Sequence, residues 1–238
     1  MRIEKKFENQ LKDLGRKLTT GQEQAFEKYY NLLSHWNDFI NLTGITEKEE
    51  VYEKHFLDSL SLVKLLDVEK AQRILDVGTG AGFPGIPLKI VFPHLQVVLL
   101  DSLRKRVDFL EEVVKELKLE SVSCVHARAE ELARKKEYRQ GFDLVVSRAV
   151  ADLAVLSEYS LPFVEVGGSF VAYKSINAGE EVERSFEAIE LLGGQIKEKM
   201  MFELPGTKVG RMLLQIEKVS DTPVEYPRRT GKPLKKPL

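Results

Sequence analysis

The chain has 238 residues, of which 43% are hydrophobic and 31% charged, a composition typical of a folded protein with one good core. Its 36 basic and 37 acidic residues nearly cancel, so a nucleic-acid partner would have to meet a local basic patch. The single cysteine, Cys124, excludes an internal disulfide and is typical of a reducing compartment. We find no apolar run of membrane-spanning length and no signal peptide, and therefore expect a cytoplasmic protein with no membrane partner.

Residues 1–70 are predicted to form a helical N-terminal extension. Thr20 and Glu23 have the spacing of a capping box, which predicts that a helix begins there, and Thr46 and Glu49 repeat the pattern. Large apolar residues follow the first of these starts at spacings of three and four, which predicts a helix face: Phe26, Tyr29, Leu33, Trp36 and Ile40. We expect Trp36 to pack against a sheet, with stacking on a nucleobase as the alternative.

Residues 71–220 alternate between strand-like and helical patterns. The expected strands are 74–78, 95–101, 122–125, 142–147, 169–174, 196–203 and 211–218, and the expected helices are 85–92, 103–117, 151–161 and 180–192. Such alternation predicts an α/β fold, a doubly wound, mostly parallel Rossmann-like sheet with helices on both faces. The last two strands are joined by a short turn, which predicts a terminal antiparallel hairpin.

The most informative stretch follows the first of these strands and reads Asp76-Val-Gly78-Thr-Gly80-Ala-Gly82-Phe83-Pro-Gly85. Closely spaced glycines let a backbone approach a ligand, and the helix that follows aims free N–H groups into the turn. Gly80 to Gly85 fits the dinucleotide pattern G-x-G-x-x-G, but the first glycine after the strand is Gly78. Asp76 just before it suits a ligand with a cationic or hydrogen-donating group. The run resembles motif I of S-adenosylmethionine-dependent methyltransferases; the alternative is a turn without a ligand.

The ends of the next three strands carry further candidate ligand contacts, because ligands of such sheets bind at the carboxyl ends of the strands. Asp101 can accept hydrogen bonds from ribose hydroxyls, or it can cap the next helix. Ala129 and Glu130 would lie beside an adenine, although Arg128 and Glu130 can also form an exposed pair. Arg148 needs an anion, either a ligand or an internal carboxylate.

Longer segments carry a more specific pattern: Asp76–Leu88, Leu100–Leu110, Ser147–Ala149, Trp36–Thr43, His55–Ser59 and Tyr226–Leu238. They resemble the RsmG family, also called glucose-inhibited division protein B, over about residues 25–238. The resemblance implies methylation of guanosine N7 in bacterial 16S ribosomal RNA, with S-adenosylmethionine as cofactor. It implies that the cofactor contacts are Gly78, Phe83, Ala129, Glu130 and Arg148. Ser175 after Lys174 is a departure, because a glycine is expected there.

Methyl transfer to guanine N7 needs no deprotonation, because this nitrogen carries an exposed lone pair. In-line transfer then requires positioning, and carboxylates or aromatic faces would stabilise the charge that appears on the purine. We therefore predict no catalytic acid or base. The four histidines lie too far apart in the sequence to indicate a metal site.

Guanine N7 lies on the major-groove edge, which is deep and narrow in A-form RNA. The target is therefore expected in a loop or junction, or turned out of its stack. Residues expected to hold it are Arg148, Lys174, Asn41, His55 and Asp58, with helix capping as the alternative for the last three.

Residues 221–238 form a basic, proline-rich tail. From residue 228 onward the tail has five basic residues and no acid, and its prolines predict extended chain and no helix. We expect an RNA-backbone clamp made by Arg228, Arg229, Lys235 and Lys236, with a solvated tail as the alternative.

Three functions are compatible with these patterns. The first is an RNA methyltransferase, acting as a monomer on ribosomal RNA or on its ribonucleoprotein. The second is a dinucleotide-dependent oxidoreductase, which the position of Asp76 disfavours. The third is an RNA-binding protein without methyl transfer, which the intact glycine loop and Asp101 disfavour.

Overall fold

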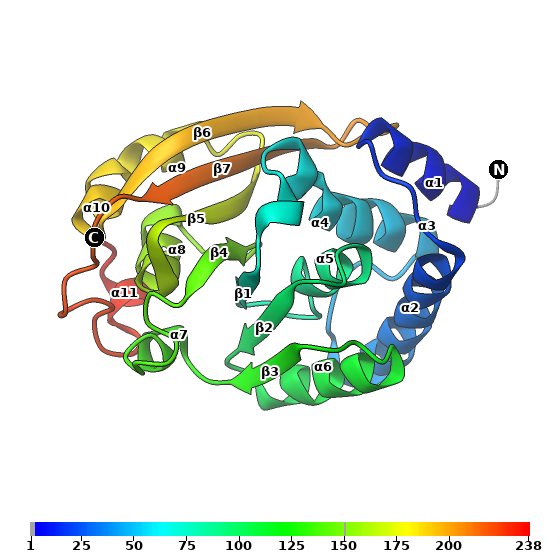
Figure 1. The fold of residues 1–238 in the computed structure, drawn as a ribbon, viewed down its shortest axis with the longest axis horizontal. Helices are drawn as coiled ribbons and strands as arrows, with labels where there is room; N and C mark the ends of the chain where they lie inside the picture. The colour runs from blue at the N-terminus through cyan, green and yellow to red at the C-terminus, as the bar shows by residue number, and fades with distance from the viewer. Residues whose placement is uncertain (1–2, 150) are drawn as a thin grey trace.

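A mixed sheet runs through the centre of the molecule. The computed structural model describes residues 3–149 and 151–238, and within them the sheet has seven strands in the order β3-β2-β1-β4-β5-β7-β6 (Figure 1). The strands are β1 (Arg73–Val77), β2 (Gln96–Asp101), β3 (Val122–His126), β4 (Phe142–Ser147), β5 (Val164–Ser175), β6 (Gly194–Glu203) and β7 (Gly210–Lys218). The first five are parallel, and β7 pairs antiparallel with both β5 and β6. The predicted doubly wound sheet with a terminal hairpin is confirmed.

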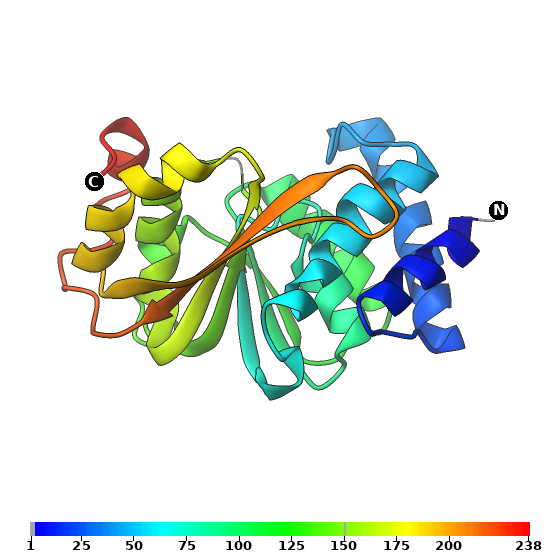
Figure 2. The same cartoon turned by 90° about the horizontal axis from the view of Figure 1, so that it is seen from above.

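Helices cover both faces of this sheet (Figure 2). One face carries α1 (Ile3–Asp13), α2 (Thr20–Ile40), α3 (Lys48–Val51), a π-helical turn (Tyr52–Leu57), α4 (Asp58–Leu60), α5 (Gly85–Val91) and α6 (Arg104–Glu116). The other carries α7 (Ala129–Leu132), α8 (Leu153–Ser160), α9 (Gly179–Arg184), α10 (Phe186–Leu191) and, in the C-terminal tail, α11 (Lys232–Lys235). Short 3-10 turns span Ser61–Lys64, Val68–Lys70 and Leu161–Phe163. Over the described ranges, no helix combines the length and the apolarity that a bilayer crossing requires.

Alternation along the strands divides the apolar residues between two cores. Ile74 faces the core under the N-terminal helices, whereas Leu75 faces the core under α8 and α10. The first core includes an aromatic cluster of Phe7, Phe26 and Phe56, whose ring centroids lie 5.0–6.4 Å apart. The N-terminal helices therefore share a core with the sheet.

The helices begin near the predicted positions, α2 at Thr20 and α3 at Lys48, but both predicted capping residues are wrong. The capping box at α2 consists of Thr19 and Gln22, because extended backbone at Thr19 lets its hydroxyl meet the N–H of Gln22. The second start lacks a side-chain cap: Glu47 precedes α3, and the hydroxyl of Thr43 orders the turn before it by accepting from the N–H of Ile45. Trp36 is a packing residue as expected, but its contact is Phe109 of α6, at 5.7 Å between ring centroids.

The C-terminal tail folds back onto α7 and α8. Arg139 donates to the carbonyl oxygens of Thr222 and Tyr226 at 2.8 and 2.9 Å, and Arg134 donates to Pro227 at 2.6 Å. The prediction that the tail contains no helix is wrong, because Pro233 occupies the first turn of α11, where a missing N–H costs little.

Candidate active site

The glycine loop between β1 and α5 is fixed to the end of β2. Gly78 and Thr79 donate backbone hydrogen bonds to the carbonyl oxygen of Leu100 at 2.9 and 3.1 Å. Gly80 donates from its N–H to Asp101 Oδ2 at 2.9 Å. The φ angles of Gly78 and Gly80 are 69° and 62°, in the left-handed region that other residues rarely adopt. The glycines therefore allow the loop to fold tightly over the strand ends.

Asp76 lies underneath this loop and is fully buried. Its Oδ2 accepts hydrogen bonds from Thr79 Oγ1 at 2.6 Å and from the N–H of Gly85 at 2.8 Å, while no described residue bonds its Oδ1. Burial raises the pKa of Asp76 to about 7, against the lowering effect of those two hydrogen bonds. Asp76 organises the loop from below and is absent from the cavity wall above it.

A small cavity of about 210 Å³ opens above the carboxyl ends of β1, β2, β3 and β4. Four of the predicted cofactor contacts line it: Gly78, Asp101, Ala129 and Glu130. The sheet order reverses between β1 and β4, so this is the switch point where such sheets bind ligands.

Asp101 has the helix-capping role that the sequence left open as its alternative, and it also lines the small cavity. Its Oδ1 accepts from the N–H of Leu103 at 2.9 Å, just before α6, and its Oδ2 accepts from Gly80. Arg106 lies 3.4 Å from the same Oδ2. A carboxylate has about four acceptor positions, so Asp101 keeps capacity for a hydroxyl group from the cavity.

Glu130 is not half of an exposed pair with Arg128, because it is buried. Its Oε1 accepts from the N–H of Gly231 at 2.9 Å, so the tail closes behind this wall of the cavity. Tyr159 lies on the same wall, and burial together with the charge of Glu130 raises its pKa to about 12. The small cavity thus presents two carboxylates and glycine backbone, which suits the hydroxyl and amine groups of a nucleoside.

Gly82 and Phe83 lie outside the walls of the small cavity. Gly82 is buried with a φ of 97°. The Phe83 ring stacks on His55 at 4.5 Å between centroids, and the guanidinium carbon of Arg148 lies 5.0 Å from its centroid. Phe83 therefore connects the glycine loop to the charged cluster beside it.

That charged cluster is centred on Asp58, which is buried. Arg148 Nη1 donates to Asp58 Oδ2 at 2.9 Å, and Arg211 Nε donates to Asp58 Oδ1 at 2.8 Å. Arg148 thus has the internal carboxylate that the sequence left open as its alternative. Arg211, from β7, was missed because nothing near it in the sequence links it to Asp58.

His55 completes the cluster as a neutral imidazole. A guanidinium has no acceptor, so Nδ1 must accept the 3.0 Å hydrogen bond from Arg148 Nη2, and Nε2–H must donate to Thr43 Oγ1 at 2.8 Å. Burial and the neighbouring charge of Arg148 lower the pKa of His55 to about 3. His55 and Asp58 therefore fix Arg148 and do not cap helices.

A second, large cavity of about 580 Å³ lies beside the first, at the ends of β4 and β5. The two cavities share the walls at Ala149 and Ala151, and Arg148 and Lys174 line the large one. Lys174 is nearly buried, and its Nζ donates to the carbonyl oxygen of Ala151 and to Glu181 Oε1, both at 2.6 Å.

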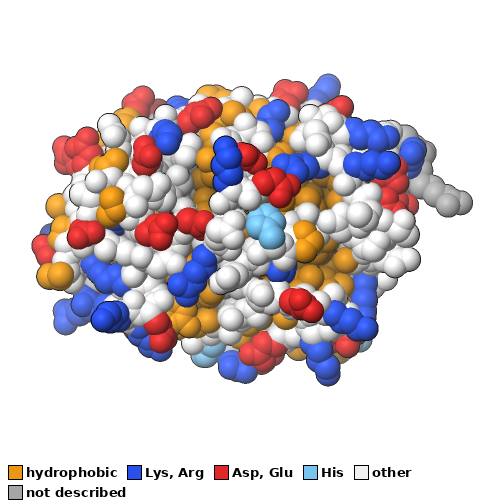
Figure 3. Space-filling model, in the orientation of Figure 1, with side chains coloured by type: hydrophobic (Ala, Val, Ile, Leu, Met, Phe, Trp, Pro, Cys, Tyr) orange, Lys and Arg blue, Asp and Glu red, His pale blue; other side chains and the backbone are white. Residues whose placement is uncertain are grey.

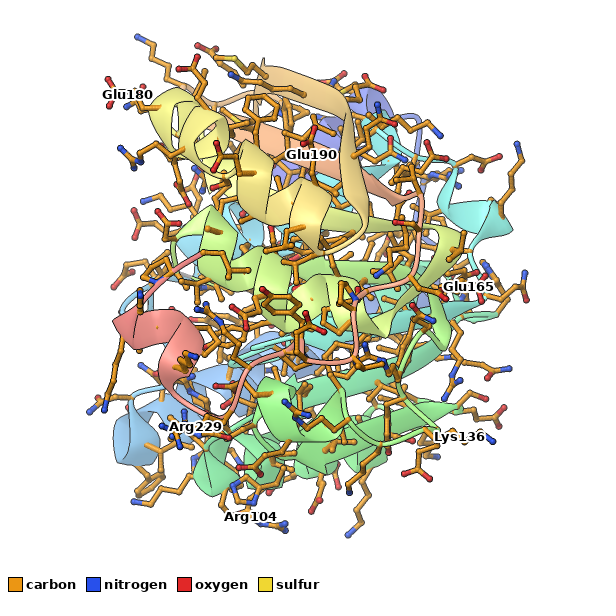
Figure 4. The ribbon with its side chains drawn as sticks, turned by 90° about the vertical axis from the view of Figure 1, so that its left-hand side faces the viewer. Arg104, Lys136, Glu165, Glu180, Glu190 and Arg229 are labelled. Atoms are coloured by element: carbon orange, nitrogen blue, oxygen red, sulfur yellow. The ribbon has the colours of Figure 1, made fainter. Side chains whose placement is uncertain are left out.

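The remaining predicted RNA contacts lie apart from both cavities. Asn41 is exposed in the left-handed conformation that ends α2, the capping position named as its alternative. Arg228 forms an internal ion pair with Glu158, whose side chain is fully buried. Arg229, Lys235 and Lys236 are exposed, and basic side chains gather over α7 and α11 at the lower left of Figure 3. Figure 4 shows Arg229 and Arg104 at one end of this side of the molecule and Glu180 and Glu190 at the other.

Comparisons with known proteins show which family the chain belongs to. The family model described as rRNA small subunit methyltransferase G matches residues 22–206. A curated protein of that name from Lachnoclostridium phytofermentans is 54% identical over 238 residues, covering 100% of this chain and 98% of its own length. Its namesake from Bacillus thuringiensis is 48% identical over 238 residues, covering 100% and 99%.

Solved structures share the fold at low sequence identity. M. jannaschii TYW2 in complex with AdoMet has a TM-score of 0.55 at 17% identity, covering 74% of this chain and 80% of that one. A ribosomal protein L11 methylase from Lactobacillus delbrueckii subsp. bulgaricus has a TM-score of 0.52 at 18% identity, covering 69% and 77%.

Proposed function

We propose that this chain, which belongs to the rRNA small subunit methyltransferase G family, transfers the methyl group of S-adenosylmethionine to N7 of a guanosine in 16S ribosomal RNA. Membership of that family establishes an S-adenosylmethionine-dependent methyltransferase. The position on the base and the residues involved are our proposal. The observation that carries it is a carboxylate-lined cavity, at the switch point of the sheet, that shares a wall with a larger cavity.

The residues of the small cavity fit the cofactor. Asp101 has acceptor capacity left for ribose hydroxyls, and the wall at Ala129 and Glu130 offers a buried carboxylate and backbone groups to an adenine amine. Gly78 leaves the ligand room beside Ala149, whose Cβ would be 3.4 Å from any Cβ at position 78. When bound, S-adenosylmethionine supplies an electrophilic methyl group on a sulfonium. We assign supporting roles to Asp76, Gly80, Gly82 and Phe83, which shape the loop, and to Arg148.

We infer a mechanism in which the chain positions and does not exchange protons. Guanine N7 attacks in line through its own lone pair, so no general base is required. The neutral state of His55 down to about pH 3 agrees with this, because an imidazole held by Arg148 and Thr43 has no free nitrogen for proton transfer. The chain's contribution is to hold the two reactants and exclude water.

RNA is proposed to reach the large cavity over the basic surface of the tail. Arg229, Lys235 and Lys236 are exposed and extend from a segment that is fixed to the cofactor side of the sheet. Phosphate contacts of this kind position RNA without reading its sequence. The target guanosine must be unpaired or flipped, because N7 in an A-form helix is inaccessible. A ribosomal substrate also implies a cytoplasmic enzyme.

The experiment that tests this proposal is mass mapping of methylated nucleotides in 16S ribosomal RNA from cells with and without the protein. We expect one 7-methylguanosine to disappear in cells without it and to return when purified protein and S-adenosylmethionine are added. An unchanged modification map, or thermal stabilisation by NAD and not by S-adenosylhomocysteine, would contradict the proposal.

A further inference from the structure

The large cavity has the position and size to receive a base turned out of an RNA strand. It meets the small cavity along Ala149 and Ala151, and it is also lined by the end of β5 and the start of α9. At about 580 Å³ it has ample room for one purine. Groups that read that base would have to come from the polar side chains that line this cavity.

Lys174 and Glu181 line the large cavity as an ion pair that touches the shared wall at Ala151. Lys174 Nζ has three N–H donors, of which two are used by Ala151 and by Glu181 Oε1. Among the described residues, none forms a hydrogen bond with Glu181 Oε2. The side chains are 8% and 22% exposed, so both are mostly withdrawn from water. One donor and one acceptor therefore remain side by side at the cavity wall.

This donor and acceptor match the Watson–Crick edge of guanine. Guanine presents the O6 acceptor next to the N1–H and N2–H donors, so O6 can meet the lysine while N1–H and N2–H meet the carboxylate. Adenine presents a donor where guanine has O6, and an acceptor at N1, so it would oppose both groups. Recognition of this edge leaves N7 free on the imidazole side of the base.

We infer that Lys174 and Glu181 read the target guanine by its Watson–Crick edge inside the large cavity, an inference that rests on the proposed function. Glu181 is a specificity residue that also stabilises the transition state. As N7 takes the methyl group, positive charge develops on the purine and strengthens the N1–H hydrogen bond to the carboxylate. Lys174 in addition fixes the wall between the cavities through the carbonyl of Ala151.

The test compares Glu181→Gln with Glu180→Gln, a matched control on the same helix. Glu180 is exposed, points outward in Figure 4 and does not line the cavity. With small-subunit RNA from cells lacking the protein, we expect Glu181→Gln to lower kcat/KM about 10- to 100-fold, because one bidentate base contact is lost. We expect both variants to bind S-adenosylhomocysteine like the unaltered protein, measured by calorimetry.

Replacing the mapped target guanosine by inosine, which lacks the N2 amine, separates recognition from structure. The unaltered protein should lose at least about tenfold in rate on inosine, whereas Glu181→Gln should lose little more, because the contact is already gone. The inference would be overturned if Glu181→Gln and Glu180→Gln had equal rates. It would also be overturned if inosine slowed Glu181→Gln by the same factor as it slows the unaltered protein. If the unaltered protein made no 7-methylguanosine, the proposed function would fail instead.

Discussion

Replacing Arg228 is expected to destabilise the fold, because this arginine neutralises a buried carboxylate. Arg228 donates three hydrogen bonds from its guanidinium to Glu158, at 2.5–3.0 Å, and a fourth from its backbone N–H at 2.7 Å. The side chain of Glu158 is fully buried and that of Arg228 is 13% exposed. The pair therefore fastens the tail to α8.

Arg228→Met keeps the backbone bond and the alkyl chain but leaves Glu158 without a counter-charge. Removing one member of a buried pair costs about 3–5 kcal/mol. For a chain of this size, each kcal/mol lowers Tm by about 2–4 °C, so we expect a fall of roughly 6–20 °C. If the tail detaches while the rest of the chain stays folded, the loss of stability is limited to the free energy with which the tail packs on α8. Protease cleavage near Gly231 should then rise.

The assay is thermal unfolding of Arg228→Met beside Arg229→Met, the adjacent exposed arginine, which should change stability by less than about 0.5 kcal/mol. The double variant with Glu158→Leu should recover much of the loss, because it removes the unpaired charge as well. Equal melting curves for the two methionine variants, together with weaker RNA binding by Arg228→Met, would refute this reasoning. Arg228 would then be the RNA contact expected from the sequence.

Three further predictions concern the loop, the tail and the histidine. Gly80→Val should weaken S-adenosylhomocysteine binding by more than about tenfold in calorimetry while the chain stays folded. A Cβ at position 80 would meet no atom within 4 Å, so the effect comes from the backbone φ of 62°, which valine disfavours. Unchanged affinity would contradict the role given to the loop. Replacing Arg229, Lys235 and Lys236 by alanine should make RNA binding less sensitive to salt. The plot of log K for RNA binding against log salt concentration should become shallower by about 2 to 3, because each lost phosphate contact contributes about 0.7–0.9 to its slope. An unaltered slope would show that the tail is not part of the RNA interface. The folded state keeps His55 neutral to about pH 3, whereas in the unfolded chain His55 binds a proton below about pH 6.5. The free energy of unfolding should therefore fall by up to about 1.4 kcal/mol per pH unit as the pH is lowered from 6.5 toward 3. In urea unfolding, His55→Gln should lack that component, and parallel pH profiles would show that His55 titrates normally.

The strands were predictable because the signals that form them are local. Phe142–Ser147 is an apolar run with the predicted bounds, and the turn at Leu204 links the last two strands as expected. Gly78, Asp101 and Glu130 could be grouped in advance because parallel strands end at one edge of a sheet.

The contacts around Asp58 could not be predicted, because they join residues far apart in the chain. Arg211 lies 153 positions from Asp58, and no pattern near either residue names the other. The same holds for the bond from Gly231 to Glu130, which spans 101 positions. The capping box of α2 was predicted one residue too late for a different reason. Thr19 and Thr20 carry the same hydroxyl group, and only the extended backbone of Thr19 makes it the capping residue.

The bond between Gly231 and Glu130 has a consequence for how the enzyme matures. Synthesis proceeds from the N-terminus, so the segment that supplies Gly231 leaves the ribosome long after β1 to β4. A nascent chain that has not reached this residue lacks the N–H group that Gly231 donates to Glu130 Oε1. The hydrogen bond behind this wall of the small cavity thus forms only after the residues of the first four strands have been made.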